Sequence, residues 1–196
     1  MLQVGVTGGI GSGKTLVCSV LEKLGIPVYH ADLQARQLMN EDLNLKEKII
    51  DLFGEEAYLD GALNRRFLAG SVFSDERKLS GLNALVHPAV RRDYTRWINQ
   101  QEGVPYVVEE AAILFESGAA LLMDLKVLVY ASEEVRIKRV IKRDGVDEAN
   151  VRGRMKNQMD EEDKRRLADL VIVNDGKEML LPQIIEMHQK IINRIV

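Results

Sequence analysis

The residues between Gly8 and Thr15 have types and a spacing that suit phosphate binding. They read Gly8-Gly9-Ile10-Gly11-Ser12-Gly13-Lys14-Thr15 and satisfy the pattern G-x-x-x-x-G-K-[ST]. In such a loop, successive backbone amides and the positive end of the following helix surround a β-phosphate. The lysine reaches the β- and γ-phosphates, and the Ser or Thr hydroxyl takes one Mg²⁺ position. The pattern predicts a nucleoside triphosphate site in which Lys14 is catalytic and Thr15 is the metal ligand.

The residues predicted to bind the nucleotide form one continuous run. A glycine-rich turn without a ligand is the alternative, but the run lies between a predicted strand and a predicted helix, which favours the phosphate site. The predicted nucleotide-binding residues of this run are Gly9, Ile10, Gly11, Ser12, Gly13, Lys14, Thr15 and Leu16.

A parallel sheet buried on both faces is predicted to carry the loop. Five apolar segments have the lengths and the near-continuous apolar composition of such strands. They are Leu2–Thr7, Val28–Ala31, Tyr106–Val108, Val127–Ala131 and Leu170–Val173. The helical spacing of Val17, Leu21 and Leu24 predicts a helix after the loop, and a last helix is expected at about 178–194. The predicted fold class is α/β, a three-layer fold of the P-loop NTPase type with a five-stranded parallel sheet.

Two stretches do not fit a simple alternation of strands and helices. From Asp32 to about Gln101 the chain shows only helical periods and turns, and a second, densely charged helical stretch runs from Glu133 to Arg166. We therefore expect a single domain, 1–196, with two helical insertions. The predicted parts are a core at about 1–32, 104–132 and 168–196, a helical acceptor-binding region at about 33–103, and a helical lid at about 133–167.

The overall charge is mildly negative but unevenly distributed. The 196 residues include 27 Lys and Arg against 30 Asp and Glu, which argues against a protein that coats nucleic acid. Without the five basic residues of the segment 136–143, 22 basic residues would remain against 30 acidic ones. No apolar run approaches the length of a membrane span. We expect a cytoplasmic protein without membrane or nucleic-acid partners, monomeric or weakly self-associating.

Asp32 stands where the second predicted strand ends. Ligands of open α/β sheets bind at the carboxyl edge of the strands, and a carboxylate there can accept or orient the proton of an attacking hydroxyl. The alternative is an N-cap for a helix that starts near Leu33. Position alone does not decide between these interpretations, and Asp32 is kept as a candidate catalytic residue.

Arg136, Arg139 and Arg143 share one face of a predicted helix. Like charges at this spacing repel each other, and closing over a triphosphate would relieve the repulsion. The alternative is a set of salt bridges to the acidic run 160–163. We favour phosphate binding, and we expect a small kinase in which this helix belongs to the lid.

Other polar residues have two interpretations each. Glu109 and Glu110 follow an apolar strand, where P-loop enzymes often keep a carboxylate near Mg²⁺, although an exposed strand end is nearly as plausible. His87, before Pro88 at an expected helix junction, is assigned to a turn. His188 is expected to be structural, and Cys18 to be a small buried hydrophobe.

The sequence resembles the dephospho-coenzyme A kinase family over nearly its whole length. The order and spacing of the shared segments carry the resemblance. They are Thr7 to Lys14, Ala31-Asp32, Asp60-Gly61-Ala62-Leu63-Asn64-Arg65 with Val72-Phe73, His87-Pro88, Leu114-Phe115-Glu116, and Ala168-Asp169 to Asn174.

The resemblance implies transfer of the ATP γ-phosphoryl to the 3′-hydroxyl of dephospho-CoA, which gives CoA and ADP in the final step of coenzyme A biosynthesis. It implies ATP and Mg²⁺ as cofactors. Asp32 would be the base, Arg139 and Arg143 would belong to the lid, and Asn174 would lie near the adenine.

The chain departs from the family pattern at three places. The family often has Asp where this chain has His30, Pro where it has Ala112, and Gln where it has Arg136. The alternatives to this function are another small-molecule nucleoside or nucleotide kinase and a nucleotide-dependent regulatory switch. The residues alone leave open the roles of Glu109, Glu110 and Glu116.

Overall fold

A computed structural model describes residues 1–73 and 75–195 of the chain. Position 196, which closes the predicted domain 1–196, lies outside the described residues. The chain forms two compact units. Unit 1 comprises Met1–His30 and Gln100–Val196, and unit 2 comprises Ala31–Asn99.

Unit 1 is built on a parallel sheet that has five strands among the described residues. In spatial order they are β2 (Val28–His30), β5 (Tyr106–Glu110), β1 (Leu2–Thr7), β6 (Leu125–Tyr130) and β7 (Leu170–Val173). Each neighbouring pair is parallel, with Val4 opposite both Val108 and Leu125. The predicted α/β class with its parallel sheet is confirmed.

The boundaries of three predicted strands were wrong by a few residues. Ala31 belongs to a helix and not to β2. β5 continues beyond Val108 to Glu110, and β6 lies at Leu125–Tyr130, two residues earlier than expected at its start. These errors follow from reading strands as purely apolar, because the added residues include two glutamates and a lysine.

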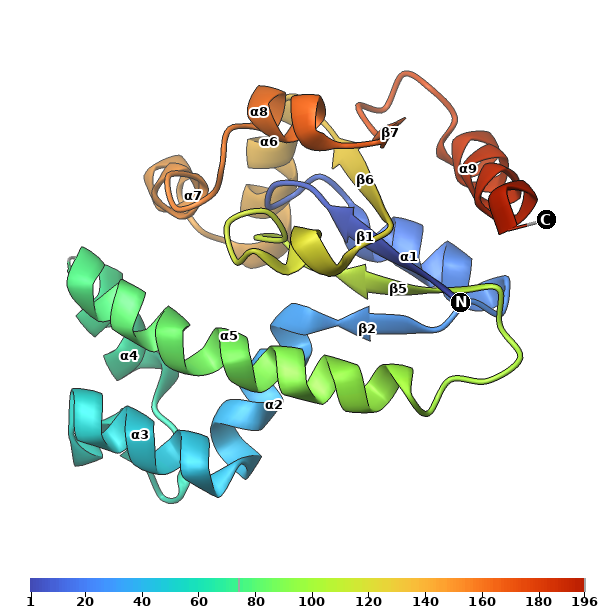
Figure 1. Ribbon diagram of the computed structural model, residues 1–196. Coiled ribbons are helices and arrows are strands. Elements are labelled where there is room, and N and C mark those ends of the chain that lie inside the picture. Colours follow the sequence, from blue (N-terminus) through green and yellow to red (C-terminus); the bar gives the residue numbers. More distant parts are fainter. Residues whose placement is uncertain (74, 196) are drawn as a thin grey trace. The chain divides into compact units, whose positions relative to one another are not determined.

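The helices of unit 1 cover both faces of the sheet (Figure 1). The helices are α1 (Lys14–Lys23), α6 (Glu133–Asp144), α7 (Glu148–Met155), α8 (Glu161–Leu167) and α9 (Leu180–Ile195), with the short 3₁₀ helix η2 (Ala119–Leu122) after β5. Helix α9 begins at Leu180, two residues later than the expected start at about 178. Together with the sheet they give the predicted three layers.

One face of the sheet is covered by α1 and α9. Alternate residues of β1, Val4 and Val6, point into this apolar core. Cys18, Leu21 and Ile184 reach it from the two helices, so the prediction of Cys18 as a buried hydrophobe is confirmed. Burial also raises the pKa of the Cys18 thiol, which therefore stays neutral.

The opposite face of β1 is approached by the segment that follows β5. A Cβ atom at Gly5 would stand only 2.5 Å from Leu114 Cδ2 and 2.9 Å from Met123 Cγ. Across the sheet from these residues, the Tyr106 hydroxyl and His188 Nδ1 are hydrogen-bonded at 2.8 Å and join β5 to α9. The prediction of a structural role for His188 is confirmed.

Unit 2 is mainly helical, and its longest helix contacts the other three. The helices are α2 (Ala31–Glu41), α3 (Leu43–Phe53), α4 (Arg65–Phe73) and α5 (Glu76–Ile98), with the 3₁₀ turn η1 (Glu55–Ala57). Asp42, Asn64 and Asp75 accept hydrogen bonds from backbone amides at the starts of α3, α4 and α5. The expected helix junction at His87-Pro88 was wrong, because α5 continues through Pro88.

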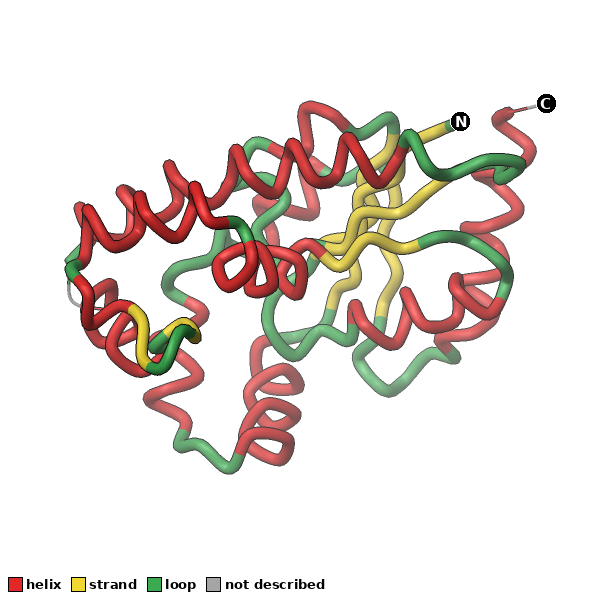
Figure 2. Tube along the Cα trace, turned by 90° about the horizontal axis from the view of Figure 1, so that it is seen from below, coloured by secondary structure: helices red, strands yellow, loops and turns green. Residues whose placement is uncertain are grey.

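Unit 2 also contains a β-hairpin, which the sequence analysis had assigned only to helices and turns. Strands β3 (Tyr58–Leu59) and β4 (Ala62–Leu63) are antiparallel (Figure 2). Asp60 and Gly61 between them have φ angles of 51° and 80°, the left-handed values that a two-residue hairpin turn requires. The Asn40 side chain accepts a hydrogen bond from the Leu63 amide at 2.8 Å, which fastens the hairpin to α2.

Candidate active site

The phosphate loop, residues 8–13, joins β1 to α1 at the carboxyl end of the central strand. Gly8, Gly11 and Gly13 have φ angles of 149°, 82° and 98°, which L side chains rarely adopt. Because the first amides of a helix have no intrahelical partner, the start of α1 presents N–H groups and the positive end of the helix dipole. An anion is stabilised at such a helix start.

Three glycines of the phosphate loop allow other elements to approach its backbone closely. A Cβ atom at Gly9 would stand 2.0 Å from Arg136 Nη1, and one at Gly11 would stand 2.6 Å from the Arg136 carbonyl oxygen. A Cβ atom at Gly13 would stand 2.2 Å from Asn174 Nδ2. The loop is therefore enclosed by α6 and by the residue that follows β7.

Lys14, the predicted catalytic lysine, is buried at the start of α1. Its Nζ atom donates a hydrogen bond of 2.8 Å to the Gly8 carbonyl and lies 3.9 Å from Glu110 Oε1. The ammonium group is thus held beside the loop that it is predicted to serve. Thr15 and Leu16 follow in the first turn and are exposed.

Glu109 and Glu110 are the last two residues of β5, and both are buried. The interpretation of these residues as an exposed strand end was wrong. Glu110 lies between two cationic groups, because its second carboxylate oxygen is 3.0 Å from His30 Nδ1. A buried carboxylate in this place compensates the charge of Lys14.

His30 is the last residue of β2 and contacts two carboxylates. Its Nδ1 atom faces Glu110, and its Nε2 atom lies 3.3 Å from Glu22 of α1. Burial alone would lower the pKa of His30, but the hydrogen bonds to Glu110 and Glu22 outweigh it and raise the pKa above its ordinary value. The two neighbouring carboxylates therefore stabilise the protonated ring.

Arg139 of α6 and Asn174, which follows β7, meet at the phosphate loop. The Asn174 amide donates to the Ser12 carbonyl at 2.7 Å, and its oxygen accepts from Arg139 Nη2 at 3.4 Å. Arg139 Nη1 also lies 3.4 Å from the Ser12 carbonyl. The structure brings these two predicted site residues together.

The other predicted arginines have different surroundings. Arg143 forms an ion pair with Asp144 at 2.7 Å near the end of α6. Arg136 is buried beside Glu161, with 3.9 Å between Nη1 and Oε1. The alternative of a salt bridge to the acidic run 160–163 is therefore correct for Arg136.

Asp32 lies in the first turn of α2 in unit 2, directly after the end of β2. The expectation of a helix that starts near Leu33 with Asp32 as its N-cap was wrong, because α2 already begins at Ala31. Chain continuity keeps Asp32 two residues from His30. Its predicted role as a base stays a prediction.

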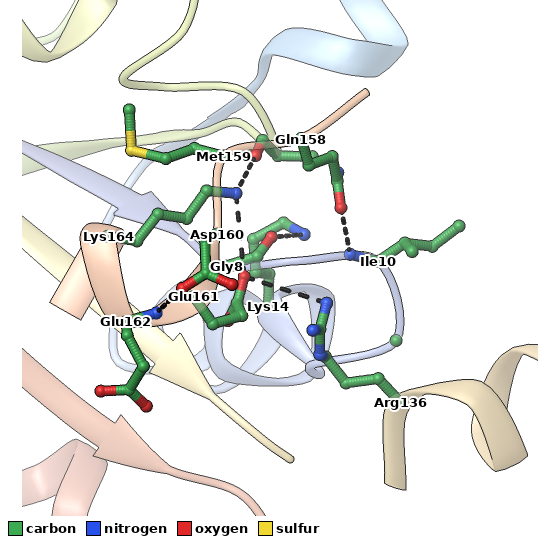
Figure 3. A network of polar contacts seen from close by, with 12 residues as sticks. Gly8, Ile10, Lys14, Arg136, Gln158, Met159, Asp160, Glu161, Glu162 and Lys164 are labelled. Carbon is green, nitrogen blue, oxygen red and sulfur yellow. Dashed lines mark hydrogen bonds and ion pairs between the residues drawn. The ribbon is translucent and has the colours of Figure 1, made fainter. Parts of the chain in front are cut away.

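Side chains from several separate segments support the region of the phosphate loop, and the sequence indicated neither Gln158 nor Lys164 among them (Figure 3). Gln158 accepts a hydrogen bond from the Ile10 amide at 3.0 Å, and Glu116 accepts one from the Met159 amide at 2.6 Å. Lys164 is fully buried and donates to the Ala112 carbonyl at 3.1 Å. These contacts join segments far apart in the chain, so no local pattern could have indicated them.

A parallel sheet whose central strand leads through a G-x-x-x-x-G-K-T loop into a helix, with a buried lysine beside the loop, defines a fold of the P-loop NTPase type. Among the described residues, no helix combines the length and apolarity needed to cross a membrane.

Comparisons with known proteins identify the family. The family model of dephospho-CoA kinase matches residues 2–179. A dephospho-CoA kinase of Salinibacter ruber is 44% identical over 179 residues, which are 90% of each chain. One from Bacteroides fragilis is 38% identical over 186 residues, which are 95% of this chain and 91% of the relative. The chain belongs to the dephospho-CoA kinase family.

A solved structure supports the same architecture. A crystal structure from Thermus thermophilus superposes with a TM-score of 0.85 at 36% sequence identity, and it covers 100% of this chain and 98% of that one.

Substitution of Gly13 by alanine is expected to disrupt the site. The new Cβ would overlap the Asn174 amide and would adopt an unfavourable φ. We expect Gly13→Ala to weaken ATP binding at least tenfold, and to lower the free energy of unfolding by about 1–3 kcal/mol from the backbone strain. Isothermal titration calorimetry and urea unfolding measure the two effects.

Gly25→Ala is the matched control for Gly13→Ala. Gly25 has a similar φ of 81°, but nothing lies within 4 Å of a Cβ built there. Gly25→Ala should lower the free energy of unfolding as Gly13→Ala does, but it should leave ATP affinity unchanged. Equal ATP affinities of Gly13→Ala and wild type would contradict the assigned role of the Gly13–Asn174 contact.

The raised pKa of His30 predicts a pH-dependent contribution to stability. The protonated ring is favoured in the folded state, so this stabilisation is complete below the unfolded pKa of about 6.5. It is lost as pH rises through the higher pKa of the folded state. We therefore expect the difference in free energy of unfolding between wild type and His30→Gln to be larger at pH 6 than at pH 8.5.

Urea unfolding of both proteins at the two pH values measures this difference. His87 and His188 titrate in both proteins, so their contributions cancel. A difference that does not change with pH would show that His30 carries no proton-linked stabilisation.

Proposed function

We propose that this chain catalyses transfer of the γ-phosphoryl group of ATP to the 3′-hydroxyl of dephospho-CoA, giving CoA and ADP. The observation that carries the proposal is the family match over residues 2–179, combined with a phosphate loop that meets the steric requirements of its motif. ATP is the donor expected of a kinase of this family.

The charges around the phosphate loop support phosphoryl transfer. Lys14 would stabilise negative charge on the moving phosphoryl group, and the amides at the start of α1 would hold the neighbouring phosphate. Arg139 is already placed at the loop carbonyls of Gly11 and Ser12. Arg143 would contribute from the same helix face, and closure of the lid, 133–167, would exclude water.

Mg²⁺ suits the donor atoms that the chain offers. The Thr15 hydroxyl is exposed in the first turn of α1, and the carboxylates of Glu109 and Glu110 end β5. Among the described residues, no group of three or more His, Cys, Asp or Glu side chains could hold a metal ion. The phosphates would therefore provide further oxygen ligands, as is usual for Mg²⁺ at kinase sites. When bound, Mg²⁺ neutralises charge on the phosphate oxygens.

The acceptor is proposed to bind in the helical region 33–103. Within unit 2, a cavity of about 500 Å³ is lined by Asn64, Arg66, Phe67, Gly70 and Ser71. A guanidinium and an aromatic ring in one cavity suit an acceptor that carries phosphates and a base. Asp32, at the start of this region, would accept the proton of the attacking hydroxyl.

Mass spectrometry of ATP and dephospho-CoA incubated with the protein tests the function. We expect CoA and ADP in equal amounts, and we expect Lys14→Ala to slow their formation about 1000-fold, since it removes a main stabilising charge. Lys23→Ala, at the exposed end of α1, is the matched control and should retain full activity.

Other outcomes of this experiment select the alternatives. Phosphorylation of another nucleoside or nucleotide in an acceptor panel, with dephospho-CoA unchanged, would indicate a different small-molecule kinase. Slow ATP hydrolysis without any phosphorylated acceptor would indicate a regulatory switch.

Asp32→Asn tests the proposed base. The amide keeps the size of the side chain but cannot accept the proton, so kcat should fall about 100- to 10,000-fold. The KM for ATP should change less than threefold. Steady-state kinetics give both values, and a variant that loses stability while its kcat is retained would show that Asp32 is only a structural residue.

A further inference from the structure

Three charged side chains, Arg136, Glu161 and Lys164, are buried next to the phosphate loop (Figure 3). Arg136 comes from α6 and the other two come from α8. Their exposed fractions are 7%, 8% and 0%. Buried charges are costly to keep unless they are paired and hydrogen-bonded, so the way in which these three are paired carries information.

Arg136 is close to the loop but is incompletely bonded. Its Nη1 atom lies 2.0 Å from the position that a Cβ of Gly9 would take, so the guanidinium lies against the loop backbone. The ion pair with Glu161 spans 3.9 Å, well beyond a hydrogen bond. Arg136 Nε and both carboxylate oxygens of Glu161 are buried without a hydrogen bond to any described residue.

Lys164 provides Glu161 with a second cationic partner. The distance from Lys164 Nζ to Glu161 Oε1 is 3.8 Å, and Lys164 is also held by the Ala112 carbonyl and by Glu116 at 3.4 Å. If Arg136 turned away from Glu161, the carboxylate would still face a fixed ammonium group. The arrangement thus allows Arg136 to leave without creating a lone buried anion.

We propose that Arg136 is an additional phosphate-binding residue, which exchanges Glu161 for an oxygen of the bound nucleotide. The proposal rests on the proposed function, because it requires ATP at the phosphate loop. A guanidinium group forms charge-assisted hydrogen bonds with phosphate oxygens. It would gain at the phosphate the hydrogen bonds that it lacks at Glu161.

Lys14 offers a parallel on the same loop. It also faces a buried carboxylate, Glu110, at 3.9 Å. Both cations therefore have their charge compensated in the absence of a ligand, but neither carboxylate holds its cation at hydrogen-bonding distance. A purely structural buried pair is instead expected to form bonds of about 2.7–2.9 Å.

A double-mutant cycle tests the exchange. Calorimetry gives the dissociation constant for ATP in the wild type, Arg136→Gln, Glu161→Gln and the variant that carries both changes. We expect Arg136→Gln to raise this constant about ten- to a hundredfold through loss of a charged hydrogen bond. Glu161→Gln should lower it about threefold or more, because the competing partner is removed.

The variant with both substitutions distinguishes an exchange of partners by Arg136 from a general electrostatic effect of Glu161 on ATP binding. In the Arg136→Gln background, Glu161→Gln should change ATP affinity much less than it does in the wild type. Equal effects in the two backgrounds would overturn the exchange. Unchanged affinity in Arg136→Gln, or weakened binding in Glu161→Gln, would also overturn it.

Circular dichroism and thermal unfolding without nucleotide check that each variant is folded. If Arg136→Gln does not fold, Arg136→Lys takes its place, because it keeps the charge beside Glu161 but lacks the planar fork. Arg136→Lys should raise the dissociation constant for ATP by less than the ten- to hundredfold expected for loss of the whole guanidinium group, and unchanged affinity would overturn the proposal.

Measurements on the wild-type protein distinguish a failure of this proposal from a failure of the proposed function. Wild-type protein that binds ATP but does not phosphorylate dephospho-CoA would contradict only the function, and the cycle would remain decisive for Arg136. Wild-type protein that does not bind ATP would overturn both.

Discussion

The backbone of the phosphate loop is approached on several sides to distances that leave no room for a Cβ atom. Glycines at positions 9, 11 and 13 allow Arg136 and Asn174 to come this close, from α6 and from the residue after β7. The loop therefore packs closely against α6 and against the residue that follows β7. The positions of Lys14 and Arg139 depend on this packing, because both side chains bond to loop carbonyls.

Three basic side chains near the loop lie close to buried carboxylates. Lys14 faces Glu110 and Arg136 faces Glu161. His30 contacts the other carboxylate oxygen of Glu110. Each carboxylate is buried or partly buried, so it reduces the cost of keeping cations together near the sheet edge. Because the two neighbouring carboxylates raise the pKa of His30, the stability of this region is expected to respond to pH.

Features that local patterns determine could be predicted from the sequence. The motif located the loop and Lys14, and apolar runs located all five strands, two of them with the observed boundaries. The partners of Arg136 and Arg143 could not be predicted, because helical spacing defines a face of a helix but not the residues that this face contacts. The hairpin at Tyr58–Leu63 was missed although Asp60-Gly61 is a typical hairpin turn, since strands of two residues are too short for periodicity to detect.

The pairing of β2 with β5 places a particular demand on folding. Val28 pairs with Val108, and all of unit 2 lies between them in the chain. Closing an unstructured loop of that length costs about 4 kcal/mol in entropy. Packing of α2 on α5, the first and last helices of unit 2, shortens the loop that must be closed. This edge of the sheet should therefore form late in folding, after unit 2 has acquired its helices. Its long-range pairing should also raise the contact order of the protein and so slow folding.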